Sequence, residues 1–219
     1  MNTLTKLALG LMGQVKPRPA VGAAAATRAL PPPARDGGLP LMRALWHRQS
    51  QRDFSPEPLS DLDLSNVLWA AAGINRAELG GRTAPSAMNA QEVQLYAALP
   101  DGLYLYDPKA HVLRLTSASD ARRVTGYQDF VDDAALDLIY VADHTQMKLV
   151  PAAQREAYAH TAAGAMAQNV YLYCASAGLA TVVRAWFDRH ALSQAMNLGT
   201  DQQLLLTQTV GRASGPASG

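Results

Sequence analysis

Cysteine is nearly absent from this sequence of 219 residues, because Cys174 is the single one. One cysteine excludes an internal disulfide, a CxxC redox pair and a thiolate-rich metal site. Cys174 follows two aromatic residues, Tyr171 and Tyr173, and has no organised histidine partner. We therefore expect it to be a buried small apolar residue and not a nucleophile.

Histidine pairs with metal-ligand spacing are also missing. No two histidines are separated by four residues along a helix, and there is no HxH pair. The sequence therefore predicts no metal site. The five histidines are His47, His111, His144, His160 and His190.

The chain has no large excess of charge of one sign and no long apolar run. Its 19 Lys and Arg face 18 Asp and Glu, so no overall field attracts nucleic acid or an anionic membrane. No apolar run approaches the ~20 residues of a membrane-crossing helix. We therefore expect a small-molecule substrate and neither nucleic acid nor a membrane as partner, with any anion bound by a local basic cluster.

Residues 1–38 are predicted to form a non-core arm, followed by a single domain over residues 39–219. Lys6 precedes a short apolar stretch at residues 7–12, and residues 23–26 are all small, which also fits an export signal. Three prolines at 31–33, with Gly37 and Gly38, favour a flexible, partly polyproline lead-in. We favour the arm and a cytoplasmic location; an export signal would indicate the periplasm.

Hydrophobic periodicity predicts a mixed order of helices and strands. Ser60 with Asp63 is typical of a helix start, and Gly73 ends that helix. Residues 152–177 contain no proline and one glycine, which predicts a long helix that stops at Gly178. Further helices are expected near 41–48 and 189–196, and strands at 93–97, 103–106, 112–115, 136–142, 179–183 and 204–210. This order favours an α+β sandwich with a mostly antiparallel central sheet flanked by helices.

The first motif with chemical potential is a basic segment in which Arg48, Ser50 and Arg52 occupy alternate positions. In an extended chain these side chains project to one side. The guanidinium groups of the two arginines can bind a phosphate in bidentate fashion, and the hydroxyl of Ser50 adds a further hydrogen bond. The alternative is a solvated charged loop.

The second motif is a proline turn in which Ser86 is expected to start a short helix through Asn89 and Gln91. Amide side chains can satisfy both the donors and the acceptors of a heterocyclic edge. An ordinary helix cap with two exposed amides is the alternative.

The third motif joins the long helix to the strand that follows it. Gln168 and Asn169 lie on this helix, before the glycine that ends it. Small residues at Ala163, Gly164 and Ala167 allow another helix to approach, so this face of the helix is predicted to be core or subunit contact.

These segments, in this order, resemble the FMN-dependent nitroreductase family over about residues 40–212. The resemblance is carried by Arg-x-Ser-x-Arg with Phe54, by Ala-Pro-Ser-Ala-x-Asn-x-Gln, by the Gln-Asn helix with Gly-Leu-Ala-Thr-Val, and by a final Thr-Val-Gly-Arg. The Gly-Leu-Tyr-Leu-Tyr-Asp hairpin that begins at Gly102 is similar to the SagB/ThcOx-type dehydrogenase branch.

The resemblance implies one FMN per site in a homodimer, with the long central helix at the dimer interface and the site shared between subunits. It assigns Arg48, Ser50 and Arg52 to the FMN phosphate and ribityl chain, and Arg212 to a further phosphate contact. Backbone groups of the strand would line the flavin ring. Those strand residues are Val182, Val183 and Arg184, and the partner subunit would add Ser86, Asn89 and Gln91.

One departure from the family pattern concerns the strand end. Many nitroreductases carry a proline in this strand and a Glu-Gly pair after it, whereas this chain has Val183 and then Ala185-Trp186. A backbone N–H is then left to serve flavin N5. Trp186 is expected either to cover the ring or substrate cavity or to be a core residue.

The resemblance implies ping-pong transfer of hydride through flavin N5, so that no catalytic side chain is required. NADH or NADPH would be the donor and a nitroaromatic or quinone the acceptor; in the dehydrogenase branch an azoline-type ring would lose hydride instead. Tyr158 and His160 are candidate acid donors or simple structural polar residues. The contrasting hypothesis is a non-catalytic protein that binds or senses flavin or another nucleotide on the same fold.

Overall fold

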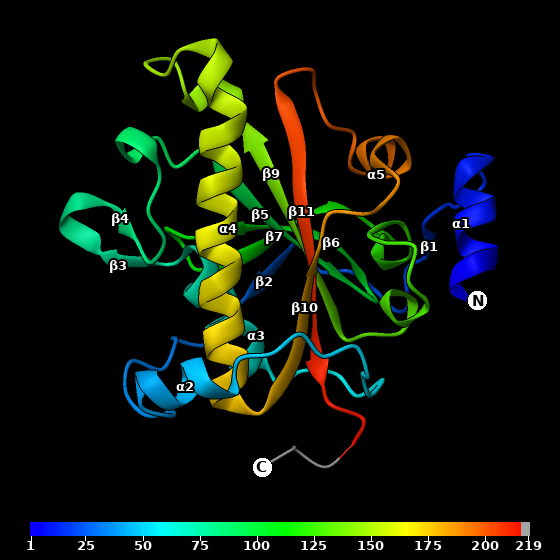
Figure 1. Cartoon of the computed structure of the whole chain (residues 1–219), viewed down its shortest axis with the longest axis horizontal. Helices are drawn as coiled ribbons and strands as arrows, with labels where there is room; N and C mark the ends of the chain where they lie inside the picture. Colours follow the sequence, from blue (N-terminus) through cyan, green and yellow to red (C-terminus); the bar gives the residue numbers. More distant parts are fainter. Residues whose placement is uncertain (216–219) are drawn as a thin grey trace.

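A seven-stranded sheet forms the centre of the computed structural model, which describes residues 1–215 (Figure 1). Its strand order is β10-β11-β9-β5-β6-β7-β2, and every neighbouring pair is antiparallel. The strands of this sheet are β2 (Thr27–Ala29), β5 (Val93–Leu99), β6 (Gly102–Asp107), β7 (Val112–Ser117), β9 (Leu136–Asp143), β10 (Leu179–Arg184) and β11 (Gln202–Arg212). The predicted α+β architecture with its antiparallel sheet is confirmed.

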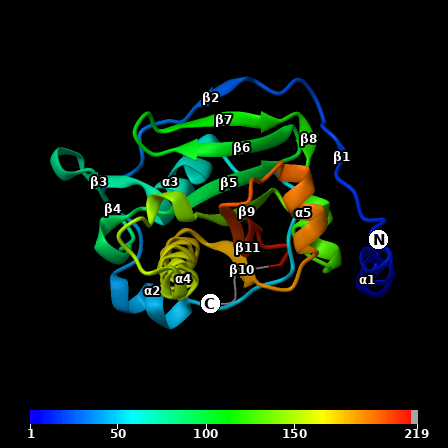
Figure 2. The ribbon, with the colours of Figure 1, turned by 90° about the horizontal axis from the view of Figure 1, so that it is seen from above.

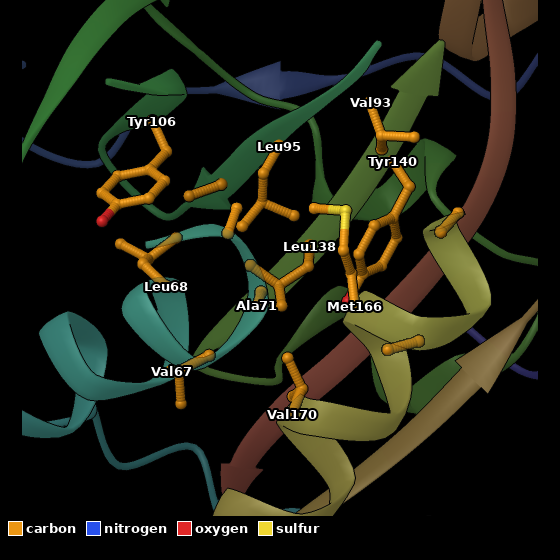
Figure 3. Packing of buried hydrophobic residues seen from close by; sticks show 14 of the residues in the cluster. Val67, Leu68, Ala71, Val93, Leu95, Tyr106, Leu138, Tyr140, Met166 and Val170 are labelled. Carbon is orange, nitrogen blue, oxygen red and sulfur yellow. The ribbon is translucent and has the colours of Figure 1, made fainter. Parts of the chain in front are cut away.

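Helices cover both faces of the sheet, as Figure 2 shows from above. One face carries α2 (Leu41–His47), α3 (Asp61–Ala72) and α4 (Ala152–Ala177), and the other carries α5 (Arg189–Met196). The main core lies between the sheet and the helices α3 and α4 (Figure 3). In this view Leu68 of α3 and Met166 of α4 point toward Leu95 and Tyr140 of the sheet. A second core on the opposite face includes Leu192 and Met196 of α5.

The local signals at the helix ends act as predicted. The hydroxyl of Ser60 accepts a hydrogen bond from the backbone N–H of Asp63 at 3.0 Å, which caps α3. The long helix runs over the expected 26 residues, and Gly178 ends it with a left-handed φ of 69°. Such a φ is strained for residues with a Cβ. The small residues divide between two faces, because Ala163 and Ala167 are in the core whereas Gly164 faces open space.

The N-terminal arm requires a correction, because residues 1–38 are not separate from the core. Strand β2 pairs with β7 and completes the sheet, and Leu30 joins the main core. Helix α1 (Thr3–Leu11) buries Lys6, whose ammonium contacts the carboxylate of Asp132 at 2.5 Å. Strand β1 (Arg18–Pro19) pairs with β8 (Ser119–Asp120). These contacts join residues far apart in sequence, so the low local periodicity of the arm gave no sign of them.

The proline turn also differs from its prediction. Ser86 does not cap a helix; one 3-10 turn, η2 (Ala87–Asn89), follows it, and its hydroxyl accepts from the N–H of Gln91 at 2.9 Å. Met88, Asn89 and Gln91 all have φ near 53–54°, which is left-handed backbone and interrupts any helix. Two short strands precede the turn, β3 (Ile74–Arg76) and β4 (Gly81–Arg82), linked by η1 (Ala77–Leu79). They project from the body as a hairpin (Figure 1).

The remaining short elements lie on the connections between β8 and β9 and between β9 and α4. They are the 3-10 turns η3 (Arg122–Val124), η4 (Asp129–Asp132) and η5 (His144–Gln146). No helix within residues 1–215 is long and apolar enough to cross a membrane.

Candidate functional site

The basic segment at residues 48–52 lies against the outer edge of the sheet. The strand β10 is an edge strand, so one side of its backbone is not used by the ladder with β11. The N–H of Gln51 donates to the carbonyl of Thr181 at 3.0 Å and fixes the segment to that edge. A second attachment follows at residues 53–55, which exchange backbone hydrogen bonds with residues 212–214 at the end of β11.

Tyr171 of α4 connects the segment to β10. Its hydroxyl accepts from the backbone N–H of Val183 at 2.9 Å and shares a hydrogen bond of 2.8 Å with the hydroxyl of Ser50. The guanidinium of Arg48 lies over the same tyrosine ring, 5.3 Å from its centroid. Tyr171 therefore orders Arg48, Ser50 and Val183 at once, and we call these four residues the Tyr171 cluster.

Tyr171 was not expected to be a site residue. It belongs to an apolar stretch of a long helix, and its side chain is 6% exposed, so the sequence pattern is that of a core residue. Nothing in the residue spacing shows that its hydroxyl reaches a segment 121 positions away.

The guanidinium groups of Arg48 and Arg52 have no carboxylate partner. Within residues 1–215 neither side chain takes part in an ion pair, and Arg52 is exposed. Arg212 is the last residue of β11, because this strand extends beyond the predicted range of 204–210. Its side chain is held only loosely, by Glu57 at 3.8 Å and Asp63 at 3.7 Å. Two arginines without a carboxylate partner in the described part of the chain, and a third with weak contacts, are thus available to an anionic group.

The three strand residues do not share one orientation, and Arg184 in particular requires a correction. The carbonyl of Thr181 and the N–H of Val183 point to the outer edge, so by the alternation of an antiparallel ladder Val182 and Arg184 direct their backbone groups to β11. The side chain of Arg184 is buried on the other face of the sheet, 2.7 Å from Asp137. Of the three, only Val183 offers its backbone at the outer edge.

A cavity of about 270 Å³ lies beside the segment. It is lined by Gln49 and Gln51, together with His47, Cys174 and Ser176. Burial raises the pKa of the Cys174 thiol well above its usual range, because the surroundings disfavour the thiolate. This thiol is therefore a poor nucleophile, as its sequence context suggested.

The second motif lies apart from the Tyr171 cluster in the same chain. The amide of Gln91 donates to the carbonyl of Gly80 at 2.8 Å and to the side chain of Asn89 at 3.2 Å. Within residues 1–215 the hydrogen bonds of these side chains are made with neighbouring parts of the turn and the β3–β4 hairpin, and none joins them to Arg48 or Ser50. The role predicted for Ser86, Asn89 and Gln91 therefore needs a second subunit, and it stays a prediction.

Other candidates have structural partners. Trp186 is 54% exposed and packs against the ring of Tyr127, with 5.2 Å between the centroids, so it is not a core residue. Tyr158 donates to Gln154 at 2.9 Å, and His160 lies 3.9 Å from Glu156 on the same helix. Residues 1–215 contain no group of three His, Cys, Asp or Glu side chains that could hold a metal ion.

Comparison with known proteins identifies the family. The model of the nitroreductase family matches residues 45–212. A nitroreductase-type protein of Methanocaldococcus jannaschii is 32% identical over 159 residues, which cover 68% of this chain and 80% of the relative. A crystal structure of a nitroreductase-type protein of Ralstonia eutropha JMP134 superposes with a TM-score of 0.87 at 52% identity, and covers 91% of this chain and 95% of that one.

A more distant crystal structure shows the same fold with a ligand. It is a nitroreductase-type protein of Desulfovibrio desulfuricans in complex with FMN, with a TM-score of 0.60 at 22% identity, covering 84% of this chain and 91% of that one. The family model covers most of the chain, one relative is 32% identical over 68% of it, and another is 52% identical over 91% of it. This chain therefore belongs to the nitroreductase family.

Proposed function

We propose that this protein is an FMN-dependent oxidoreductase whose phosphate site is the basic segment at residues 48–52. The observation that carries the proposal is the pair of guanidinium groups on Arg48 and Arg52 that have no carboxylate partner within residues 1–215. Family membership and the FMN complex of the Desulfovibrio desulfuricans protein support the same cofactor.

The residues present fit the phosphate and ribityl end of FMN. Guanidinium forks match phosphate oxygens and form charge-assisted hydrogen bonds with them. Arg212 can join them, because its contacts with Glu57 and Asp63 are longer than ordinary hydrogen bonds. Ser50 is held by Tyr171 at 2.8 Å, which fixes its hydroxyl close to Arg48.

FMN, when bound, supplies hydride transfer at N5 between NADH or NADPH and a small organic substrate such as a nitroaromatic or a quinone. The chain itself binds and orients. At the outer edge of β10 the carbonyl of Val183 can face a planar ring, whereas its N–H is already bonded to the hydroxyl of Tyr171. The exposed Trp186, two residues beyond the strand, can shield the ring from water. No side chain is needed as a proton donor for this role.

We infer that the second half of the site comes from an identical subunit. Helix α2 exposes four large apolar side chains, and the face of α4 at Gly164 is open. Exposed apolar patches of this kind are typical of protein interfaces. The α2 side chains are Leu41, Met42, Leu45 and Trp46, with exposed fractions of 63%, 74%, 43% and 87%. A homodimer through α2 and α4 would let the partner supply the proline turn.

Sedimentation velocity tests the dimer. The protein should sediment as a dimer at micromolar concentration, and Trp46→Glu should shift it to a monomer with reduced flavin content. Leu4→Glu, on the exposed side of α1, is the matched control and should leave the dimer intact. A wild-type monomer, or a Trp46→Glu dimer, contradicts the shared site.

An absorbance spectrum tests the cofactor and the activity. The purified protein should show a flavin band, lose it on addition of NADH or NADPH, and regain it with a nitroaromatic or quinone acceptor. Bleaching by an azoline-type substrate instead of NAD(P)H would assign the dehydrogenase direction. Bound flavin that is reduced neither by NAD(P)H nor by an azoline-type substrate would favour the non-catalytic alternative. Failure to bind FMN at all would refute the proposal.

The branch within the family is carried by the sequence pattern of the hairpin alone. Tyr104 and Tyr106 are both buried, the first bonded to Asp101 at 3.0 Å and the second to His111 at 2.8 Å. They stabilise the hairpin and lie in the core. The proposal of the dehydrogenase branch therefore does not assign these two side chains to the site.

A further inference from the structure

A second and larger cavity lies on the far side of α3 from the basic segment. Its volume is about 660 Å³, within the range of small-molecule sites. The walls come from four parts of the chain: the end of β2 with the proline run, Trp69 of α3, the β3–η1 hairpin, and the turn between β6 and β7. It shares no lining residue with the 270 Å³ cavity or the Tyr171 cluster.

The walls of this cavity are mainly apolar. Leu30, Pro32 and Pro33 form one side, and Trp69 with Ile74 forms another. The indole N–H of Trp69 donates to the carbonyl of Ile74 at 3.3 Å, which satisfies its polar atom within the wall. An apolar or aromatic ligand body would therefore bury surface here without leaving a protein donor unpaired.

The cavity is also held open by fixed contacts. The carbonyl of Pro31 accepts from the hydroxyl of Ser65 at 2.6 Å, and the N–H of Ala34 donates to Asn66 at 2.8 Å. These bonds attach both ends of the proline run to α3, and a polyproline segment has little conformational freedom to lose. A preformed cavity lowers the entropic cost of binding.

The charges at this cavity are all of one sign. Arg35 and Lys109 both line it, and within residues 1–215 no ion pair involves either side chain. No Asp or Glu is among the lining residues. The neighbouring carboxylate of Asp107 is already bound by Arg114 at 2.7 Å and by two backbone N–H groups.

His111 completes the wall but does not add a charge. Its ring nitrogens contact the hydroxyls of Tyr106 at 2.8 Å and Ser65 at 2.7 Å, and burial lowers its pKa. It is thus a neutral structural residue near pH 7. Arg35 and Lys109 are the two cations that a ligand would meet.

We propose that this cavity binds a small apolar anion, in which an aromatic or aliphatic body packs against Trp69 and the prolines and a carboxylate or sulfonate meets Arg35 and Lys109. The site is separate from the proposed flavin site and does not depend on it. Apolar contact supplies the affinity, and the two cations select for negative charge.

Fluorescent probes test the proposal on the purified protein as isolated. The anion is 8-anilinonaphthalene-1-sulfonate, and the uncharged comparison is N-phenyl-1-naphthylamine. In Arg35→Ala/Lys109→Ala the Kd of the anion should rise at least roughly tenfold, equivalent to about 1.4 kcal/mol, with the Kd of the neutral probe unchanged. Trp69→Leu should weaken both probes.

Two controls separate this site from the rest of the surface. Lys16→Ala/Lys148→Ala removes two exposed lysines elsewhere and should leave both affinities unchanged. Arg48→Ala/Arg52→Ala should also leave them unchanged, whatever its effect on flavin. Equal affinity for the anion in the wild type and Arg35→Ala/Lys109→Ala, or no binding of the anion to the wild type, would overturn the proposal.

Discussion

The arginines on the two sides of β10 differ in the partners that the fold gives them. On the face away from α4, Arg184 lies 2.7 Å from Asp137 and Arg122 lies 2.8 Å from Asp120, and all four side chains are buried. At the outer edge, Arg48 over Tyr171 has no carboxylate within residues 1–215. A charge without a partner is costly to bury, so a protein keeps it accessible. Paired arginines therefore hold the fold, and unpaired ones are available to a ligand.

Replacing both unpaired arginines should give the largest effect, and it should fall on flavin affinity alone. Charge-assisted hydrogen bonds are worth roughly 1.5–3 kcal/mol each. Arg48→Ala/Arg52→Ala should therefore raise the Kd for FMN by a factor on the order of a hundred or more. Flavin fluorescence after ultrafiltration measures it. Lys16→Ala/Lys148→Ala, which removes the same charge, should bind FMN as the wild type does; tight binding by the arginine variant would refute the phosphate assignment.

Replacing a paired arginine should instead cost stability. Burial disfavours the charged forms of both Arg184 and Asp137, lowering the pKa of the first and raising that of the second, while their contact opposes both shifts. Arg184→Met leaves the carboxylate buried without its partner, which should lower the free energy of unfolding by about 3–5 kcal/mol.

Urea unfolding at fixed protein and FMN concentrations measures this loss. The exposed Arg43 provides the control, and Arg43→Met should change little. Adding Asp137→Asn to Arg184→Met should recover part of the loss, because the buried charge is then removed. An Arg184→Met protein as stable as Arg43→Met would remove the distinction between the two groups of arginines.

The sequence distinguishes the two groups only in part. Alternation along residues 48–52 correctly places Ser50 near Arg48, because that property is local. The family resemblance, which assigned Arg184 to the flavin ring, gave no sign that its side chain is buried. That burial depends on Asp137, which lies 47 positions away on another strand. The bounds of α4 and the Ser60 cap could be predicted because each depends on neighbouring residues. The role of Tyr171 and the strand pairing of the arm could not, because both depend on distant partners.

A buried carboxylate near an arginine is intermediate between the paired and the unpaired charges. Glu92 is fully buried, and no other residue among 1–215 forms a hydrogen bond with its carboxylate oxygens, although Arg82 is close enough to attract them. Burial raises the pKa of Glu92, and that attraction opposes the shift only in part. The folded state therefore keeps the proton at a pH where the unfolded state has released it.

The sign of the pH effect follows from this raised pKa. The contribution of Glu92 to stability is fully present below its unfolded pKa, near 4.5, and is lost as the pH rises through the folded value. Glu92→Gln should remove that decline and leave the protein about 1–3 kcal/mol more stable than the wild type near pH 8. Urea unfolding near pH 4.5 and pH 8 measures it. Glu78→Gln, at an exposed position, should follow the wild type; a parallel decline in Glu92→Gln would contradict the assignment.

The smallest expected effect tests how the unpaired arginine is held in place. Tyr171→Phe removes the hydroxyl that bonds Ser50 and Val183 but keeps the ring beneath Arg48. Loss of these bonds should lower stability by about 0.5–1.5 kcal/mol. If Tyr171 positions the segment for a ligand, the Kd for FMN should also rise several-fold. The rise should be larger than for Tyr158→Phe, which removes a hydroxyl that bonds Gln154 on the same helix. A fall in stability with unchanged FMN affinity would make Tyr171 part of the fold in the same sense as Arg184. A change in affinity would place it with the unpaired arginines, as the residue that keeps Arg48 at the outer edge of β10.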